Sequence, residues 1–398
     1  MLKETIRGIV KSQVESLKFK ELGIRREKLA TINTKLSHAL IISGIRRCGK
    51  STLLKQLMKD IKKPSYFSFE DPRTSNFQLS DFGLLEEIFK EEYDTEFYFF
   101  DEIQNVKEWE RYVRKFVDEK QKTIITGSNA SLLSKELGTK LTGRHITYEL
   151  FPFSFREFLD FKKEKASVNS LIEYMKKGGF PEYLRDNDIQ LLHELVNDIL
   201  ARDIIIRNNL KEDKSIRSLL LYLLSNIGKE FSYNKLSNSL DIGSINTIIS
   251  YISYLEDCYI LFIISKIDYS YKKQLVNPKK VYCIDLGLLN TSANINKNDG
   301  MQLENLIFIH LRMKYKDIYY HKKHKECDFI IREKNKPIMA IQVCYKLTEE
   351  NQNREIEGLK EAMNEFNIPK GLIITLDQED MVDNIKVTPA WKWLEEMK

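Results

Sequence analysis

The sequence lacks the long hydrophobic runs that a membrane-spanning helix requires. Its uninterrupted apolar stretches are short, for example residues 259–264, whereas a membrane span needs about 20 residues. The first residues open an amphipathic, charged helix without the apolar core of a secretory signal, so export is not expected. These absences predict a cytoplasmic protein without a membrane partner.

Cysteine is also scarce. The chain has five cysteines, an odd number, and none of them belongs to a C-x-x-C pair. This pattern argues against a disulfide framework and against a zinc site, and it favours reduced thiols in the cytosol.

An excess of charge of one sign is missing as well. The 63 Lys and Arg residues face 58 Asp and Glu residues, and the net charge of +5 says little about binding partners. With 42% apolar and 30% charged residues and no low-complexity tract, the composition is that of a globular protein. Because single cores stop growing near roughly 250 to 300 residues, the 398 residues predict two to four domains.

The strongest motif is G-x-x-x-x-G-K-S at residues 44–51, between an apolar run and a helical pattern. Glycines at both ends permit backbone angles that let successive N–H groups converge on one phosphate group. Lys50 is expected to reach the β- and γ-phosphates, and Ser51 to bind Mg²⁺, at a helix N-terminus that attracts the same anion. The alternative, a chance glycine–lysine turn, is disfavoured by the strand–loop–helix context. The expected nucleotide-binding residues are Gly44, Ile45, Arg46, Arg47, Cys48, Gly49, Lys50, Ser51, Thr52 and, further along the chain, Ser128.

A second signal follows about 50 residues after the loop, where four aromatic residues at 97–100 run into Asp101 and Glu102. A buried parallel strand that ends in acids is where an open α/β sheet places ligand groups. Asp101 is expected to hold Mg²⁺ through water, and Glu102 to orient and deprotonate the attacking water. Two solvated acids at a strand end are the alternative, and the phosphate-loop motif upstream favours the catalytic interpretation.

Two further segments carry polar residues beside expected strands. The strand at 123–127 ends in Ser128 and Asn129, which would lie beside the γ-phosphate unless they form an ordinary turn. Arg144 precedes a fifth strand at 145–150. An arginine supplied across an interface can stabilise the charge on a transferred phosphoryl group, although Arg144 could equally form a salt bridge within its own domain.

Together with the aromatic segment at 151–158 and the Gly-Gly-Phe-Pro-Glu segment at 178–182, these motifs resemble a family of bacterial and archaeal AAA+-like ATPases. In that family an ATPase domain is followed by a winged helix and a nuclease-like domain. The resemblance covers nearly the whole chain and implies an α/β fold with a five-stranded AAA+-type parallel sheet. It also implies ATP with Mg²⁺ as the ligand, Ser128 or Asn129 as a sensor and Arg144 as an arginine finger.

The pattern along the chain predicts six segments. They are an N-terminal helical arm at 1–30, an ATPase core at 31–152, a helical lid at 153–212, a winged helix at 213–289, a linker at 290–300 and a nuclease-like domain at 301–398.

Two basic regions raise the question of nucleic-acid binding. The helix at 244–257, which would read DNA, has no Lys or Arg, whereas five lysines between 266 and 280 lie in the expected wing. A second basic cluster, interleaved with tyrosines, spans 312–325. Non-specific DNA contact, a protein-binding role and an ordinary solvated surface all remain open.

The order of elements in 301–375 is similar to the core of PD-(D/E)XK nucleases, in which carboxylates hold Mg²⁺ and a lysine assists the attack. When this chain is matched to the nuclease motif by position, Glu304 and Asp328 stand at two of the acidic positions. Gln342 stands where the motif has a third acid, and Cys344 where it has the lysine. Lys346 would share a strand face with Gln342. We therefore expect a degenerate binding module, with Glu304, Asp328, Gln342 and Lys346 as its candidate site.

The sequence as a whole predicts a protein that binds and hydrolyses ATP and couples nucleotide state to its C-terminal half. Two alternatives stay open, an ATP-gated DNA nuclease and a slow nucleotide-dependent switch or scaffold for a protein partner. A homo-oligomer is required if Arg144 acts on a neighbouring copy.

Overall fold

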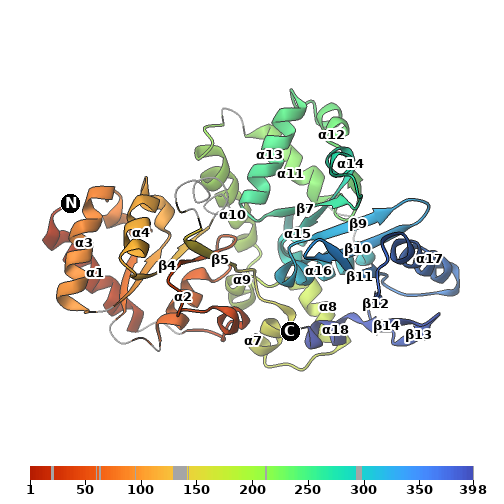
Figure 1. Ribbon diagram of the computed structural model, residues 1–398, viewed down its shortest axis with the longest axis horizontal. Coiled ribbons are helices and arrows are strands. Elements are labelled where there is room, and N and C mark those ends of the chain that lie inside the picture. The colour runs from red at the N-terminus through yellow and green to blue at the C-terminus, as the bar shows by residue number, and fades with distance from the viewer. Residues whose placement is uncertain are drawn as a thin grey trace. The chain divides into compact units, whose positions relative to one another are not determined.

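The computed structural model describes residues 1–18, 22–59, 61, 64–94, 96–128, 141, 143–210, 213–292 and 298–397. The chain divides into two compact units, Met1–Phe151 and Pro152–Lys398 (Figure 1).

The first unit is built on a five-stranded parallel sheet with the strand order β2-β3-β4-β1-β5. Its strands are β1 (Ala39–Ser43), β2 (Ser65–Ser68), β3 (Phe97–Asp101), β4 (Lys122–Gly127) and β5 (His145–Glu149). β1 and β3 are almost entirely apolar because a parallel sheet is covered on both faces. β4 lies between them, so one strand separates the phosphate-loop motif from the two acids.

Helices and an aromatic core cover this sheet. The helices are α1 (Lys3–Lys18), α2 (Lys50–Met58), α3 (Phe82–Glu92) and α4 (Trp109–Asp118), with 3₁₀ turns at Glu27–Thr31, Pro72–Thr74, Leu79–Asp81 and Ile103–Asn105. Phe82 packs edge-on against Phe77 and Phe100, with ring centroids 5.2 and 5.9 Å apart. The expected N-terminal arm, α1, buries Ile6, Ile9 and Val10 in the same core.

The second unit begins with helices. They are α7 (Phe155–Lys162), α8 (Val168–Lys177), α9 (Pro181–Asp186), α10 (Gln190–Asp198), a π-helical segment η5 (Ile199–Ile206), α11 (Lys214–Leu224), α12 (Tyr233–Leu240) and α13 (Ile245–Asp257). The Gly-Gly-Phe-Pro-Glu segment joins α8 to α9, and its tight packing explains the glycines. A Cβ on Gly179 would lie 2.3 Å from the carbonyl oxygen of Phe153, and the Gly179 N–H donates to Asp285 Oδ2 at 2.6 Å.

A mixed nine-stranded sheet forms the rest of the unit, in the order β13-β14-β12-β11-β10-β9-β7-β8-β6. The strands are β6 (Glu230–Phe231), β7 (Leu261–Lys266), β8 (Lys279–Cys283), β9 (Ile318–Lys322), β10 (Glu326–Glu333), β11 (Lys336–Val343), β12 (Gly371–Thr375), β13 (Asp380–Val382) and β14 (Ile385–Pro389). The helices among them are α14 (Tyr271–Val276), α15 (Leu286–Ser292), α16 (Asp299–Lys314), α17 (Glu349–Phe366) and α18 (Ala390–Glu396).

The expected wing is part of this larger sheet. β7 pairs with β8 in antiparallel fashion and with β9 in parallel. Strands from both sides of the expected linker at 290–300 therefore belong to one sheet. One consequence corrects the sequence interpretation: Lys279 and Lys280 are 6% and 1% exposed. Lys279 donates to the carbonyl oxygen of Gln274 and Lys280 lies beside Glu304 and Asp328, so neither lysine faces solvent, where DNA phosphates would approach.

Candidate functional site

The loop at 44–49 connects the carboxyl end of β1 to the start of α2. Gly49 has φ +99°, which favours glycine, and a Cβ on Gly44 would lie 2.1 Å from the carbonyl oxygen of Leu150. Ile45 and Cys48 are fully buried under the loop. Burial raises the pKa of the Cys48 thiol, so Cys48 packs as an apolar residue and stays protonated. Glycine spacing and two apolar anchors thus fold the backbone of the loop.

Lys50 is the first residue of α2, and its side chain is buried inside the loop. Its Nζ donates to the carbonyl oxygen of Ile45 at 3.2 Å and lies 3.6 Å from Glu102 Oε1. The lysine predicted to reach a phosphate and the acid predicted to activate water therefore form an ion pair across β4. The pairing brings together two residues that are 52 positions apart in the chain.

Asp101 ends β3 and is surrounded by hydroxyl groups. Tyr66 OH donates to its Oδ2 at 3.1 Å, and the hydroxyls of Thr126 and Ser51 also hydrogen-bond to its carboxyl group. Burial and the nearby charge of Glu102 raise the pKa of Asp101, while these hydroxyl donors oppose the rise. The Ser51 hydroxyl and the Asp101 carboxylate are adjacent oxygen ligands of the kind that Mg²⁺ prefers.

Glu102 follows the strand in a left-handed conformation, with φ 53°. Its backbone N–H donates to Thr126 Oγ1 at 3.0 Å, and Gln104 Nε2 donates to its carboxylate. The same Gln104 nitrogen lies 3.3 Å from Ser128 Oγ at the end of β4. Ser128 is thereby connected to Glu102 through one side chain. Asn129, the other sensor candidate, lies outside the described residues.

Sequence reasoning missed two residues that hold this site in place. Thr126 bridges Asp101 and Glu102, and a polar residue at the end of the apolar strand 123–127 was the available signal. Arg26 is buried, and its guanidinium donates to the carbonyl oxygens of Cys48 and Phe151, both at 2.7 Å. It lies 18 residues before Gly44, and no sequence pattern marks it.

The remaining loop residues surround this centre. Arg46 Nη1 lies 3.8 Å from Glu70 Oε1, so it makes a loose ion pair at the rim. Arg47 has φ 63° and is exposed, and Thr52 is half-buried on the first turn of α2. These three side chains flank the loop.

Arg144 lies at the opposite edge of the sheet. Its carbonyl oxygen accepts from the N–H of Ala39, the first residue of β1, and its side chain forms an ion pair with Asp118. β1 and β5 are parallel, so the starts of both strands face away from the loop that follows Ser43. The salt bridge that the sequence left open is present, and Arg144 does not reach the loop of its own domain.

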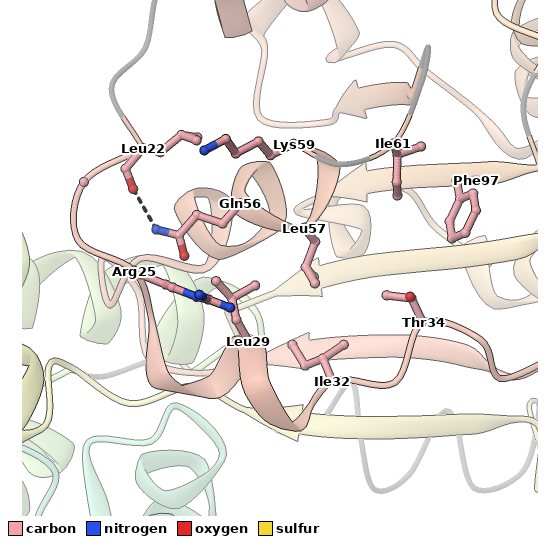
Figure 2. A pocket seen from close by; sticks show the side chains of 11 residues that line it. Leu22, Arg25, Leu29, Ile32, Thr34, Gln56, Leu57, Lys59, Ile61 and Phe97 are labelled. Carbon is pink, nitrogen blue, oxygen red and sulfur yellow. Dashed lines mark hydrogen bonds between the residues drawn. The ribbon is translucent and has the colours of Figure 1, made fainter.

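A cavity of about 580 Å³ lies at the far end of α2 from Lys50 (Figure 2). It is lined by Leu57 near the end of α2, Phe97 at the start of β3 and Ile32 before β1. Figure 2 also shows Gln56, whose Nε2 donates to the carbonyl oxygen of Leu22 at 2.7 Å. The cavity is therefore separate from the loop that carries the phosphate motif.

The second unit brings together part of the predicted nuclease-like site. Glu304 on α16 and Asp328 on β10 both contact the ammonium of Lys280, at 3.3 and 3.4 Å, and Gln342 Oε1 accepts from the Asp328 N–H at 3.2 Å. β11 ends at Val343, so the strand alternation expected to carry Lys346 onto this face stops before Lys346, which is exposed. Within the described ranges, no group of three or more His, Cys, Asp or Glu side chains is arranged to hold a metal ion. Nor does any helix there have the length and apolar character needed to cross a membrane.

Strand order, loop and acids define the first unit as a P-loop nucleotide-binding domain. Comparison with known families agrees, because an AAA domain matches residues 36–159. Two domains of unknown function (DUF8612 and DUF4143) match residues 168–299 and 299–393. The predicted AAA domain is thereby confirmed.

Two curated relatives align over most of the chain. An uncharacterized protein of Methanocaldococcus jannaschii is 36% identical over 394 residues, covering 89% of this chain and 87% of the relative. An uncharacterized protein of Haemophilus influenzae is 30% identical over 380 residues, covering 89% and 93%. The chain belongs to the same family as these two proteins.

Solved structures give more distant likenesses. A signal transduction ATPase with a tetratricopeptide repeat sensor from Pyrococcus horikoshii has a TM-score of 0.29 and 15% identity, over 74% of this chain and 46% of that chain. AMPPCP-bound DnaA from Aquifex aeolicus has a TM-score of 0.29 and 14% identity, over 63% and 88%. Both are too distant to bear on function.

Proposed function

We propose that the protein binds ATP with Mg²⁺ at the 44–52 loop, hydrolyses it, and uses the nucleotide state to control its second unit. One observation carries the proposal. Lys50 Nζ lies 3.6 Å from Glu102 Oε1, while the Ser51 hydroxyl meets the Asp101 carboxylate at the same edge of the sheet. This is the set of groups that phosphoryl transfer needs, namely a phosphate-binding cation, metal ligands and a base for water.

The ion pair suggests how binding and hydrolysis are coupled. Lys50 would exchange Glu102 for phosphate oxygens, since a triphosphate carries more negative charge than one carboxylate. Glu102, released from the lysine and still held by Gln104, would then accept a proton from the attacking water. Ser51 and Asp101 would hold Mg²⁺, which supplies charge neutralisation at the phosphates. ATP is preferred over GTP on the family resemblance alone.

Two variants test this assignment. We expect Lys50→Ala to abolish ATP binding in isothermal titration, because the loop loses its phosphate-binding cation. Glu102→Gln should bind ATP but turn it over about 10²- to 10⁴-fold more slowly, as for loss of a general base. ATP binding by Lys50→Ala as tight as that of the wild type would contradict the proposal. Turnover below about one event per hour in the wild type would instead favour the slow switch or scaffold.

For the second unit we propose a winged-helix-like part at 213–289 and a degenerate nuclease-like part at 301–398. The element order α16, β9, β10, β11, α17, β12 supports the second assignment. A DNA-binding role has less support, because lysines of the basic cluster pair with acids: Lys322 with Glu230, Lys323 with Glu365 and Lys325 with Glu357. These acids lower the net positive charge that the cluster presents to a phosphate backbone.

Arg144 retains one proposed role, that of an arginine finger toward a second copy of the chain. Its side chain is 39% exposed, and its ion pair with Asp118 is on the surface, where such pairs are weak and easily exchanged. The role demands a homo-oligomer, so full ATPase activity in a protein that light scattering shows to be monomeric would rule it out.

A further inference from the structure

The side chain of Lys280 lies in the second unit among three carboxylates. Its Nζ is 2.7 Å from Glu326 Oε1, 3.3 Å from Glu304 Oε1 and 3.4 Å from Asp328 Oδ1. The lysine is on β8, whereas the acids are on α16 and β10. Lys280 is 1% exposed, so its ammonium is removed from water and the three acids replace its hydration.

The carboxylates are held in their positions by neighbouring donors. Tyr282 OH donates to Glu304 Oε1 at 2.7 Å, and the N–H of Val343 donates to Asp328 Oδ2 at 2.9 Å. Asp328 therefore turns one oxygen toward the backbone of β11 and the other toward Lys280. Glu326 is shared with a second lysine, since its Oε2 lies 3.0 Å from Lys322 Nζ. These contacts orient the three acids toward the position that Lys280 Nζ occupies.

The charges of this cluster depend on one another. Burial opposes the charge of Lys280, but the carboxylates, with Glu304 foremost, outweigh it and hold the pKa of the ammonium well above its usual value. Burial and the charge of Glu304 raise the pKa of Asp328, whereas the charge of Lys280 opposes the rise. Two buried carboxylates that are both charged are unfavourable without a positive group beside them, and Lys280 is the positive group that lies next to Glu304 and Asp328.

We propose that Lys280 is the resident cation of this cluster and takes the position that a divalent metal ion would otherwise take between Glu304 and Asp328. The second unit then binds no Mg²⁺ at these acids and is not a metal-dependent nuclease. The lysine also joins two segments that the sequence assigned to different domains, since β8 supplies the cation and 301–398 supplies the acids. This inference concerns the second unit only and does not depend on the proposed ATPase activity.

The test removes the ammonium group of Lys280 and keeps an apolar side chain of similar length. Lys280→Met retains an unbranched apolar side chain, so Glu304 and Asp328 are left without their cation. In nucleotide-free protein, Mn²⁺ titration followed by electron paramagnetic resonance should show about one bound Mn²⁺ per chain in this variant and none at this site in the wild type. Adding Glu304→Gln should abolish the new binding.

A matched control and a second variant keep the test decisive. Lys322→Met removes the other lysine beside Glu326 but leaves Lys280, so it should bind no Mn²⁺ at this site. If Lys280→Met does not fold, Lys280→Met with Glu326→Gln carries one negative charge fewer in the cluster, and Mn²⁺ should raise its melting temperature above that in EDTA. The proposal would be overturned if the wild type bound Mn²⁺ and Glu304→Gln removed that binding. It would also be overturned if neither Lys280 variant gained Mn²⁺ binding.

Discussion

Thr126 gives the sharpest prediction about the nucleotide site, because one buried hydroxyl serves both acids. The hydroxyl donates to Asp101 Oδ1 and accepts from the backbone N–H of Glu102, and Thr126 is fully buried. Thr126→Val has nearly the same shape but can make neither bond. Thr126→Ser keeps the hydroxyl and is the matched control.

The expected cost follows from the two lost hydrogen bonds. A hydrogen bond to a charged group contributes about 1.5–3 kcal/mol, and a buried N–H left without an acceptor costs about 1–3 kcal/mol. Tyr66 and Ser51 still donate to Asp101, so we take the lower end of each range and expect Thr126→Val to lose about 2.5 kcal/mol. For a unit of this size, that loss lowers the melting temperature by about 5–10 °C. ATP turnover should also fall, since Glu102 loses the anchor of its backbone.

The first unit contains its own reporter for this measurement. Of the three tryptophans, Trp109 is buried in the core of the first unit, whereas Trp391 and Trp393 are in the second. Replacing those two by Phe leaves Trp109 fluorescence to follow the melting of the first unit alone. If Thr126→Val and Thr126→Ser melt within about 2 °C of each other, the bridging hydroxyl does not stabilise the acids as argued.

Two further predictions concern buried groups outside the motifs. Arg26→Met should weaken ATP binding about tenfold, because the carbonyl of Cys48 loses its donor. Arg26→Lys should not restore the binding, since one ammonium cannot span both carbonyls. Arg25 is exposed, so Arg25→Met is the control and should leave the ATP titration unchanged. Burial lowers the pKa of His310 to about 4, so the unfolded state binds its proton more readily and stability is lost as pH falls from about 6.5 to 4. Urea unfolding at pH 7 and pH 4 measures this loss. Between the two pH values, the free energy of unfolding should fall by about 3 kcal/mol more in the wild type than in His310→Gln. Equal losses would show that His310 does not titrate as stated.

The local part of the nucleotide site could be predicted from the chain alone. The loop at 44–51 depends on glycines, a lysine and a serine that are covalent neighbours, so their spacing already determines which backbone groups can surround a phosphate. The acids Asp101 and Glu102 could be found for a similar reason, because they directly follow an apolar strand. The five-stranded parallel sheet of the first unit was implied by the family resemblance, and the structure has it.

The tertiary structure decided everything that depends on which strand lies beside which. Alternation tells which face of a strand a residue occupies, but not the strand or helix that it meets. For this reason Lys346 was expected beside Gln342, whereas Lys280, from a strand expected to form a free wing, occupies that neighbourhood. Arg144 shows the same limit, since only the parallel pairing of β5 with β1 put it at the edge away from the loop. The sequence determined the chemistry of the contiguous motif, and long-range strand pairing determined which distant side chains complete it.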